Sequence, residues 1–248
     1  MAVRTRNIFD PCSPEPFKLS RSKIEDFLRC PRCFYLDRRL GVGKPAQLPF
    51  TLNSAVDHLL KKEFDIHRAK GEKHPLMEHS GVEAIPFSHP QLNEWRKNFV
   101  GIQYHHELTN FIITGAVDDI WVDKAGNLIV VDYKATSKDA PVGIDAEWQQ
   151  GYRNQMEIYQ WLLRRLGFQV SPIGYFVYAN GRRDRKAFDG KLEFDLTIIP
   201  YDGDDEWAEG AILEAHKCLM GDAAPESASQ CEYCQYRQEA WSAIRSHS

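Results

Sequence analysis

The stretch ITGAVDDIWVDKAGNLIVVDYKAT, residues 113–136, decides the fold. Its two halves are rich in β-branched and aromatic residues, which favour strands, and they flank the turn-forming residues 124–127. The sequence therefore predicts two neighbouring strands joined as an antiparallel hairpin.

Ionisable side chains occur at matching places in the two strands. Asp132 and Lys134 are two residues apart, so both project from one face of the strand and Tyr133 from the other. If the strands pair, Asp118 lies across from Asp132. Two such carboxylates repel each other and are costly to desolvate, and Mg²⁺ or Mn²⁺ would relieve both costs. Lys134 would then orient a water or stabilise a phosphate. The alternative is a salt-bridged sheet edge.

The rest of the chain predicts helices around this sheet. We expect helices from Ser20 onward, over 52–68, 147–166 and 204–220, and strands over 102–108, 111–122, 128–133, 173–179 and 192–199. We expect irregular structure over residues 71–90, which contain glycine, proline and several histidines, and in the tail after residue 220. This order indicates an α/β (α+β) fold with a mixed central sheet flanked by helices. We expect a flexible arm over 1–19 and a single domain over 20–248.

Composition narrows the class of protein. The 248 residues are 43% hydrophobic and 27% charged, as in globular proteins, and no apolar run reaches 18 residues. Residues 1–17 contain no apolar signal segment, so we expect a cytoplasmic protein without membrane partners. The net charge of −4 excludes a non-specific nucleic-acid coat protein. Nucleic acid would need a local basic patch, such as 181–191 or 20–39.

One amide interrupts the apolar and aromatic stripe of the predicted helix 147–166. Gln155 shares this face with Tyr159, and a buried amide requires hydrogen-bond partners. Gln155 is then either a satisfied core residue, or it and Tyr159 face the strand ends and contact metal-bound water or phosphate.

Two cysteine pairs lie almost a chain length apart. Cys30 and Cys33 form one C-x₂-C pair, and Cys231 and Cys234 form the other. In a reducing compartment this spacing favours one four-thiolate metal site that joins the two ends of the chain. Two unrelated pairs of free cysteines are the alternative.

These motifs together resemble the PD-(D/E)XK nuclease superfamily. Gly-x-x-Asp ends at Asp118, Asp-x-Lys spans 132–134, and Gln-x-x-x-Tyr spans 155–159, in the order of that superfamily. The chain is most similar to the RecB-like branch, which includes CRISPR-associated exonucleases with an iron–sulfur cluster. The resemblance covers about residues 20–236 and implies a restriction-endonuclease-like core.

The resemblance also implies roles for individual residues. Asp118, Asp132, His58 and the Tyr133 carbonyl are the implied Mg²⁺ or Mn²⁺ ligands, and Lys134 is the implied catalytic lysine, assisted by Gln155 and Tyr159. His58 is the weakest match: the family has glycine four residues earlier where this chain has Ser54, and helical geometry places His58 at the edge of the apolar face. A solvent-exposed histidine is the alternative.

We expect a 4Fe–4S cluster at the cysteine site on the strength of the resemblance, with Zn²⁺ as the alternative. The resembling nucleases hold a 4Fe–4S cluster with one cysteine before the core and three after it, and Cys30 occupies the matching N-terminal place. Here two cysteines precede the core and two follow it, with Cys33 as the replacement. The resemblance favours 4Fe–4S and the spacing alone favours Zn²⁺. The subregions 20–50 and 221–236 are expected to form this site.

The leading hypothesis is a metal-dependent DNA nuclease, an exonuclease on single-stranded or frayed ends. The resemblance implies a role in DNA repair, recombination or CRISPR-type defence, with DNA as substrate and a helicase or CRISPR adaptation proteins as partners. The alternatives are a non-catalytic DNA- or partner-binding module with a structural Cys₄ site, and a zinc adaptor in which Asp-x-Lys is coincidental.

Overall fold

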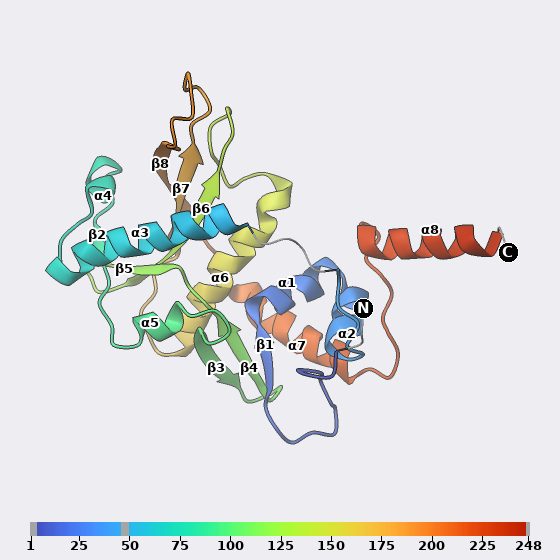
Figure 1. The fold of residues 1–248 in the computed structure, drawn as a ribbon. Coiled ribbons are helices and arrows are strands. Elements are labelled where there is room, and N and C mark those ends of the chain that lie inside the picture. The colour runs from blue at the N-terminus through green and yellow to red at the C-terminus, as the bar shows by residue number, and fades with distance from the viewer. Residues whose placement is uncertain (1–3, 46–49, 247–248) are drawn as a thin grey trace. The chain divides into compact units, whose positions relative to one another are not determined.

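The computed structural model describes residues 4–45 and 50–246 (Figure 1). Parts of the expected arm and of the expected domain, namely residues 1–3, 46–49 and 247–248, therefore lie outside the described residues. The chain divides into two compact units. The terminal unit comprises Met1–Gln47, His105–Ile113 and Glu206–Ser248, and the central unit comprises Leu48–Tyr104 and Thr114–Asp205. A single nuclease domain over 20–248 stays a prediction.

The central unit is built on a five-stranded mixed sheet of order β2-β5-β6-β7-β8. Its strands are β2 (Ala84–Pro86), β5 (Asp119–Asp123), β6 (Leu128–Thr136), β7 (Ile173–Gly181) and β8 (Phe194–Asp202). β6 pairs parallel with β7, and the other neighbours pair antiparallel. The predicted hairpin is β5–β6, in which Asp119 lies opposite Val131.

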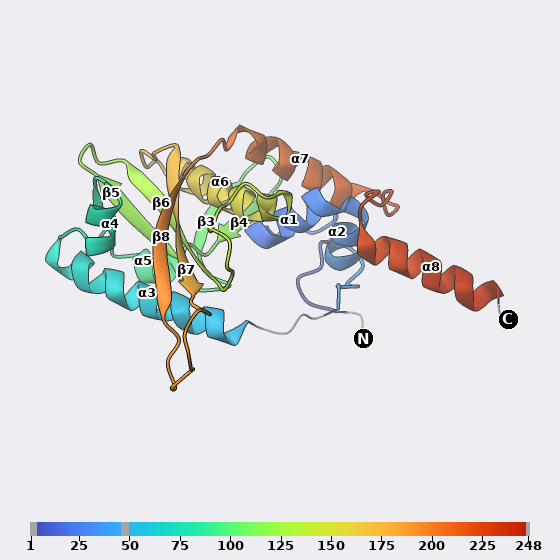
Figure 2. The same cartoon turned by 90° about the horizontal axis from the view of Figure 1, so that it is seen from above.

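Two long helices cover opposite faces of this sheet (Figure 2). On one face, α3 (Thr51–Lys70) buries Phe64 against Trp121 and Val131. On the other face is α6 (Gln150–Arg165), which follows the short helix η1 (Glu147–Gln149). The alternation of β6 therefore turns Tyr133 toward α3 and Asp132 toward α6. The mixed α/β class and both helices are as predicted.

The predicted strand over 111–122 is wrong, because the chain forms two strands there. β4 spans Phe111–Gly115, and residues 116–118 separate it from β5. Between them the Val117 N–H donates to the Trp95 carbonyl, 3.1 Å away, so Val117 is not available to a strand ladder. Gly115 is required at this bend, since a Cβ there would lie 2.5 Å from the Tyr159 ring. The break frees Asp118 from regular strand structure.

Two segments expected to be irregular are partly regular. Residues 71–90 contain α4 (Pro75–His79) and β2, and α5 (Leu92–Trp95) follows. β2 is only three residues long and includes Pro86, which fits an edge strand and leaves little sequence signal. The tail contains α8 (Glu232–Ser246), in which Cys234 is the buried residue. Among the described residues no helix is long and apolar enough to cross a membrane.

The terminal unit contains α1 (Arg21–Arg29), α2 (Pro31–Arg38), α7 (Glu206–Met220), α8 and the strand β1 (Phe17–Ser20). β1 belongs to a three-stranded sheet of order β1-β4-β3, in which β3 is Ile102–His106. Pro31 at the first position of α2 divides the expected helix after Ser20 into two and leaves Cys30 at the junction. Residues 4–16 lack regular structure, but Phe9 is buried and its N–H donates to the Arg38 carbonyl at 2.7 Å. The flexible arm over 1–19 stays a prediction.

Candidate functional site

A cleft of about 360 Å³ opens at one edge of the central unit. It is lined by α3, by the residue before β5, by β6 and by α6, through side chains that include Asp57, Asp118, Tyr133, Lys134 and Tyr152. All of these residues belong to the central unit. The part of the β5–β6 pair that the sequence singled out therefore borders a concave surface lined by ionisable groups.

Asp132 is completely buried below this cleft. Its Oδ1 accepts a hydrogen bond from Gln155 Nε2 at 2.7 Å, and its Oδ2 forms an ion pair with Lys134 Nζ. Burial raises the pKa of Asp132 to about 7; the Lys134 ammonium opposes this rise and the Asp118 carboxylate adds to it. Gln155 Nε2 also lies 3.1 Å from the Tyr159 hydroxyl. The structure thus brings Asp132, Lys134, Gln155 and Tyr159 together, and Gln155 is both a satisfied buried amide and a neighbour of the carboxylate.

Asp118 reaches the cleft from the irregular residues before β5. Its Oδ2 accepts a hydrogen bond from the Tyr133 N–H at 3.0 Å, and its Oδ1 accepts one from Lys61 Nζ at 3.0 Å. Burial alone would raise the pKa of Asp118, but Lys61 and Lys134 lower it overall. The β5–β6 register, continued by one residue, places Asp118 beside Asp132 as the sequence predicts.

Helix α3 contributes two residues that the sequence analysis missed. Lys61 Nζ bridges Asp57 Oδ2, at 2.9 Å, and Asp118 Oδ1. Burial and the nearby Asp118 raise the pKa of Asp57. Asp57, Lys61 and Phe64 follow helical spacing, so an Asp–Lys pair in line with an apolar residue was the available signal.

The structure does not bring His58 to this cluster. The side chain is exposed and does not line the cleft. A helix turns by about 100° per residue, so with Asp57 facing Asp118 the next side chain points elsewhere. The expected proximity of His58 to Asp118 and Asp132 is therefore absent among the described residues, and Asp57 lines the cleft instead.

The side chain of Tyr133 lies on the α3 face of the sheet. Its hydroxyl donates to Asp119 Oδ2 at 2.7 Å, while Asp119 Oδ1 accepts from Arg68 Nη2 at 2.6 Å and Arg96 Nη2 at 2.7 Å. Asp119 is fully buried, and Arg68 belongs to α3. This network fastens α3 to the β5–β6 hairpin and thereby fixes the two sides of the cleft.

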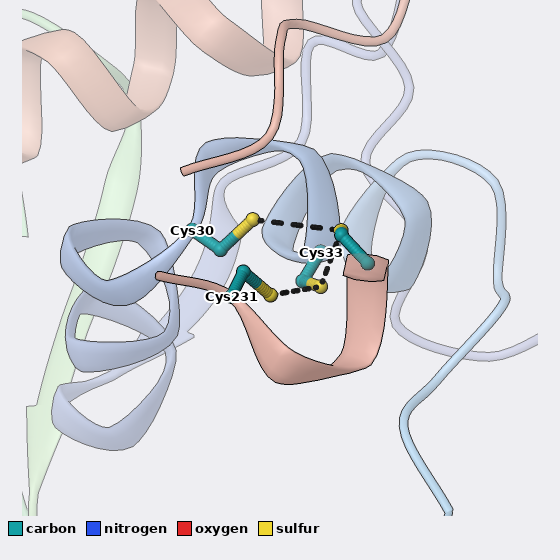
Figure 3. Close-up of side chains that lie close together, drawn as sticks. Cys30, Cys33 and Cys231 are labelled. Atoms are coloured by element: carbon teal, nitrogen blue, oxygen red, sulfur yellow. Dashed lines mark hydrogen bonds between the residues drawn. The ribbon is translucent and has the colours of Figure 1, made fainter. Parts of the chain in front are cut away.

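The four predicted cysteines meet in the terminal unit (Figure 3). Cys30 and Cys33 lie where α1 passes into α2, and Cys231 and Cys234 lie at the start of α8. The Sγ atom of Cys33 lies 3.5 Å from that of Cys231 and 3.6 Å from that of Cys234. The Sγ atoms of Cys30 and Cys234 are 3.9 Å apart. All four sulfur atoms lie within 4.8 Å of one another. The predicted clustering of the N- and C-terminal cysteines is confirmed.

The surroundings of Cys30 favour its thiolate, whereas those of Cys33 and Cys234 favour the thiol. Burial would raise the pKa of Cys30, but backbone N–H groups of Cys33 and Ala228 lower it to about 7. Burial and the neighbouring sulfurs raise the pKa of Cys33. Four buried cysteines whose sulfur atoms lie this close together could hold a metal ion. Of the other cysteines, Cys12 is exposed and Cys218 is half-buried, and neither joins this group.

Comparison with known proteins agrees with this geometry. A family model described as the PD-(D/E)XK nuclease superfamily matches residues 18–238. No curated protein sequence matches the chain significantly. The matched range contains Asp118, Asp132, Lys134 and the four cysteines. Members of this superfamily are generally nucleases that cleave phosphodiester bonds, and the chain belongs to the PD-(D/E)XK nuclease superfamily.

Proposed function

We propose that this protein is a divalent-metal-dependent deoxyribonuclease of the RecB-like branch. The observation that carries the proposal is the convergence of Asp118, Asp132 and Lys134 at one cleft of a PD-(D/E)XK chain. A salt-bridged sheet edge would account for Asp132 and Lys134 alone. It does not account for a further, half-buried carboxylate, Asp57, facing the same cleft.

The donor set fits Mg²⁺ or Mn²⁺. Asp118 and Asp132 offer carboxylate oxygens, the Tyr133 carbonyl offers a third oxygen, and hard divalent cations prefer oxygen ligands. Asp57 Oδ1 is buried and has no hydrogen-bond partner among the described residues, which leaves one more oxygen available. These four residues would hold the ion, with Asp57 at the place that the resemblance gave to His58. A bound ion would activate water and polarise the scissile phosphate.

The chain's own side chains would position the reacting groups. Lys134, paired with Asp132, can stabilise the negative charge that develops on the phosphate. Gln155 holds the other Asp132 oxygen and so fixes the orientation of that carboxylate. Tyr159 in turn orients Gln155.

The finer assignments rest on the resemblance. We propose exonuclease action on single-stranded or frayed DNA ends, in DNA repair, recombination or CRISPR-type defence. A helicase or CRISPR adaptation proteins would be the partners, and the cytoplasm the location.

The four cysteines fit a single tetrahedral ion. In a zinc–thiolate site with Zn–S distances of about 2.3 Å, tetrahedral geometry places the sulfurs about 3.8 Å apart. Three of the six sulfur–sulfur distances, at 3.5, 3.6 and 3.9 Å, are close to that value, and all six are within 4.8 Å. In a 4Fe–4S cluster each sulfur binds a different iron, so the sulfurs must lie farther apart. We therefore propose Zn²⁺ here, with 4Fe–4S as the alternative that the resemblance favours.

A nuclease assay with matched lysine variants tests the proposal. The purified protein should degrade single-stranded DNA with Mg²⁺ or Mn²⁺ and not with EDTA, and Lys134→Ala should lose at least about 100-fold in rate. Lys124→Ala is the control, since Lys124 lies in the turn of the same hairpin and pairs only with Glu83 at the surface. DNA binding without cleavage in the wild type would instead favour the non-catalytic module. Metal analysis of the same preparation separates zinc from iron.

A further inference from the structure

An exposed aromatic pair lies beside the cleft. Trp148, in η1, has 67% of its surface exposed. Its ring lies 5.7 Å from the ring of Tyr152, which lines the cleft. On the cleft side, Lys134 Nζ lies 4.4 Å from the centroid of the Tyr152 ring. A continuous line of contacts therefore runs from the catalytic-type lysine to an exposed indole.

The geometry of the pair leaves the indole open for stacking. The two rings are nearly perpendicular, at 79°, so the edge of one meets the face of the other. In either arrangement at least one face of the indole is not covered by Tyr152. By contrast, Trp95, Trp121 and Trp161 are each at most 4% exposed, so a tryptophan in this unit is normally part of the core.

We propose that Trp148 and Tyr152 form a stacking site for a nucleobase of single-stranded DNA, next to the phosphate that the cleft receives. This proposal rests on the proposed nuclease function and names its substrate class. The arrangement of charge and aromatic surface fits a nucleotide. The Lys134 ammonium beside Tyr152 would face the phosphate of a bound strand, and the indole of Trp148 would face its base. Bases in a duplex are stacked on one another and cannot offer a face to Trp148, so the site selects single strands.

The experiment measures binding without cleavage. Full-length protein is titrated into a fluorescently labelled single-stranded oligodeoxynucleotide in EDTA, which removes the divalent ions that cleavage requires. Trp148→Ala should weaken binding about 10- to 100-fold, as expected for the loss of one base–aromatic stack. Trp148→Phe should stay within about threefold, because phenylalanine still stacks. The matched control is Trp241→Ala, since Trp241 is 63% exposed but lies in the terminal unit, on α8.

An abasic scan then tests the base itself. One abasic nucleotide is moved along the oligonucleotide; at one position it should weaken binding to the wild type and have no further effect on Trp148→Ala. Additive losses at every position would overturn the stacking site, as would equal losses in Trp148→Ala and Trp241→Ala. An equal effect of Trp148→Ala on blunt duplex would overturn the single-strand selectivity. If the wild type neither binds the oligonucleotide in this titration nor cleaves DNA with Mg²⁺ or Mn²⁺, the nuclease proposal fails together with the stacking site.

Discussion

Asp118 and Asp119 are consecutive residues whose carboxylates hold opposite ends of Tyr133. Asp118 Oδ2 accepts the Tyr133 backbone N–H at 3.0 Å, and Asp119 Oδ2 accepts its hydroxyl at 2.7 Å. Arg68 and Arg96 neutralise the buried Asp119. One carboxylate thus belongs to the cleft and its neighbour to the scaffold. Together they fix the strand residue whose carbonyl we assign to the metal.

Tyr133→Phe removes one of these two attachments and leaves the ring in place. Because Asp119 Oδ2 then loses its donor while buried, we expect the free energy of unfolding to fall by about 1–3 kcal/mol. We also expect a higher Mn²⁺ concentration for half-maximal cleavage, because the strand that presents the carbonyl is less firmly held. Urea unfolding and a Mn²⁺ titration of activity measure the two effects. Tyr175→Phe is the control, a half-buried tyrosine on β7 whose ring packs against Trp121; an identical response in both variants would contradict the role of the Asp119 bond.

Asp57→Asn and His58→Ala decide which residue of α3 serves the metal. Asp57 is in contact with Lys61 and faces Asp118, whereas His58 is exposed. We expect Asp57→Asn to lose at least about tenfold in metal-dependent cleavage and His58→Ala to lose less than about threefold. Initial rates at several Mg²⁺ concentrations measure the difference. The opposite ranking of the two variants would restore His58 to the ligand set.

Asp132→Asn should stabilise the metal-free protein at alkaline pH. The pKa of Asp132 is raised to about 7 in the folded protein, from 3.8. As the pH rises between these values the unfolded chain loses its proton first, so the native state loses stability until about pH 7 and regains none above it. The amide removes this penalty. We expect a gain on the order of 1–2 kcal/mol at pH 8, or a few degrees in Tm, shrinking toward pH 4.

Circular dichroism melting in EDTA across this pH range makes the measurement. Asp123→Asn is a control of opposite sign, because hydrogen bonds from Asn127 lower the pKa of Asp123 and the change removes a favourable group. A lower Tm for Asp132→Asn at pH 8 would mean that the ion pair with Lys134 outweighs the burial cost.

Cys231→Ser should loosen the terminal unit selectively. Removing one of four thiolates lowers metal affinity strongly, and the site joins α1 and α2 to α8. We expect loss of the bound metal and faster proteolysis between α7 and α8, with the central sheet still protected. Metal analysis and limited proteolysis followed by mass spectrometry measure both, and Cys12→Ser serves as the exposed-thiol control. Protection of the tail in the metal-free variant would contradict a fastening role.

The sequence predicted best where residues interact over short distances along the chain. The β5–β6 hairpin, α3, α6, β7, β8 and α7 follow from periodicity and turn residues. Asp132, Lys134, Gln155 and Tyr159 came together as expected, because strand alternation and helical spacing fix their directions. The clustering of the cysteines also followed, since thiolates at this spacing have few other uses in a reduced protein.

The misses depend on contacts between distant segments. Val117 leaves the strand pattern because its N–H bonds to Trp95, and no local signal reports that bond. β2 exists because β5 offers it a partner. The rotation of α3 about its axis turns Asp57 toward the cleft and His58 away from it. The ion pair between Arg68 of α3 and Asp119 holds this rotation. Helical periodicity alone does not decide which of two consecutive residues points toward the sheet.

The terminal unit has a consequence for synthesis of the protein. Its three segments flank and interrupt the central unit, and the thiolate site draws on residues 30–33 and 231–234. A chain growing from the ribosome therefore exposes Cys30 and Cys33 long before Cys231 and Cys234 are translated. By the time these last two cysteines emerge, every residue of the cleft has emerged before them. The central unit can thus complete its sheet first, whereas the four thiols can bind a metal ion together only after the last cysteines have been made.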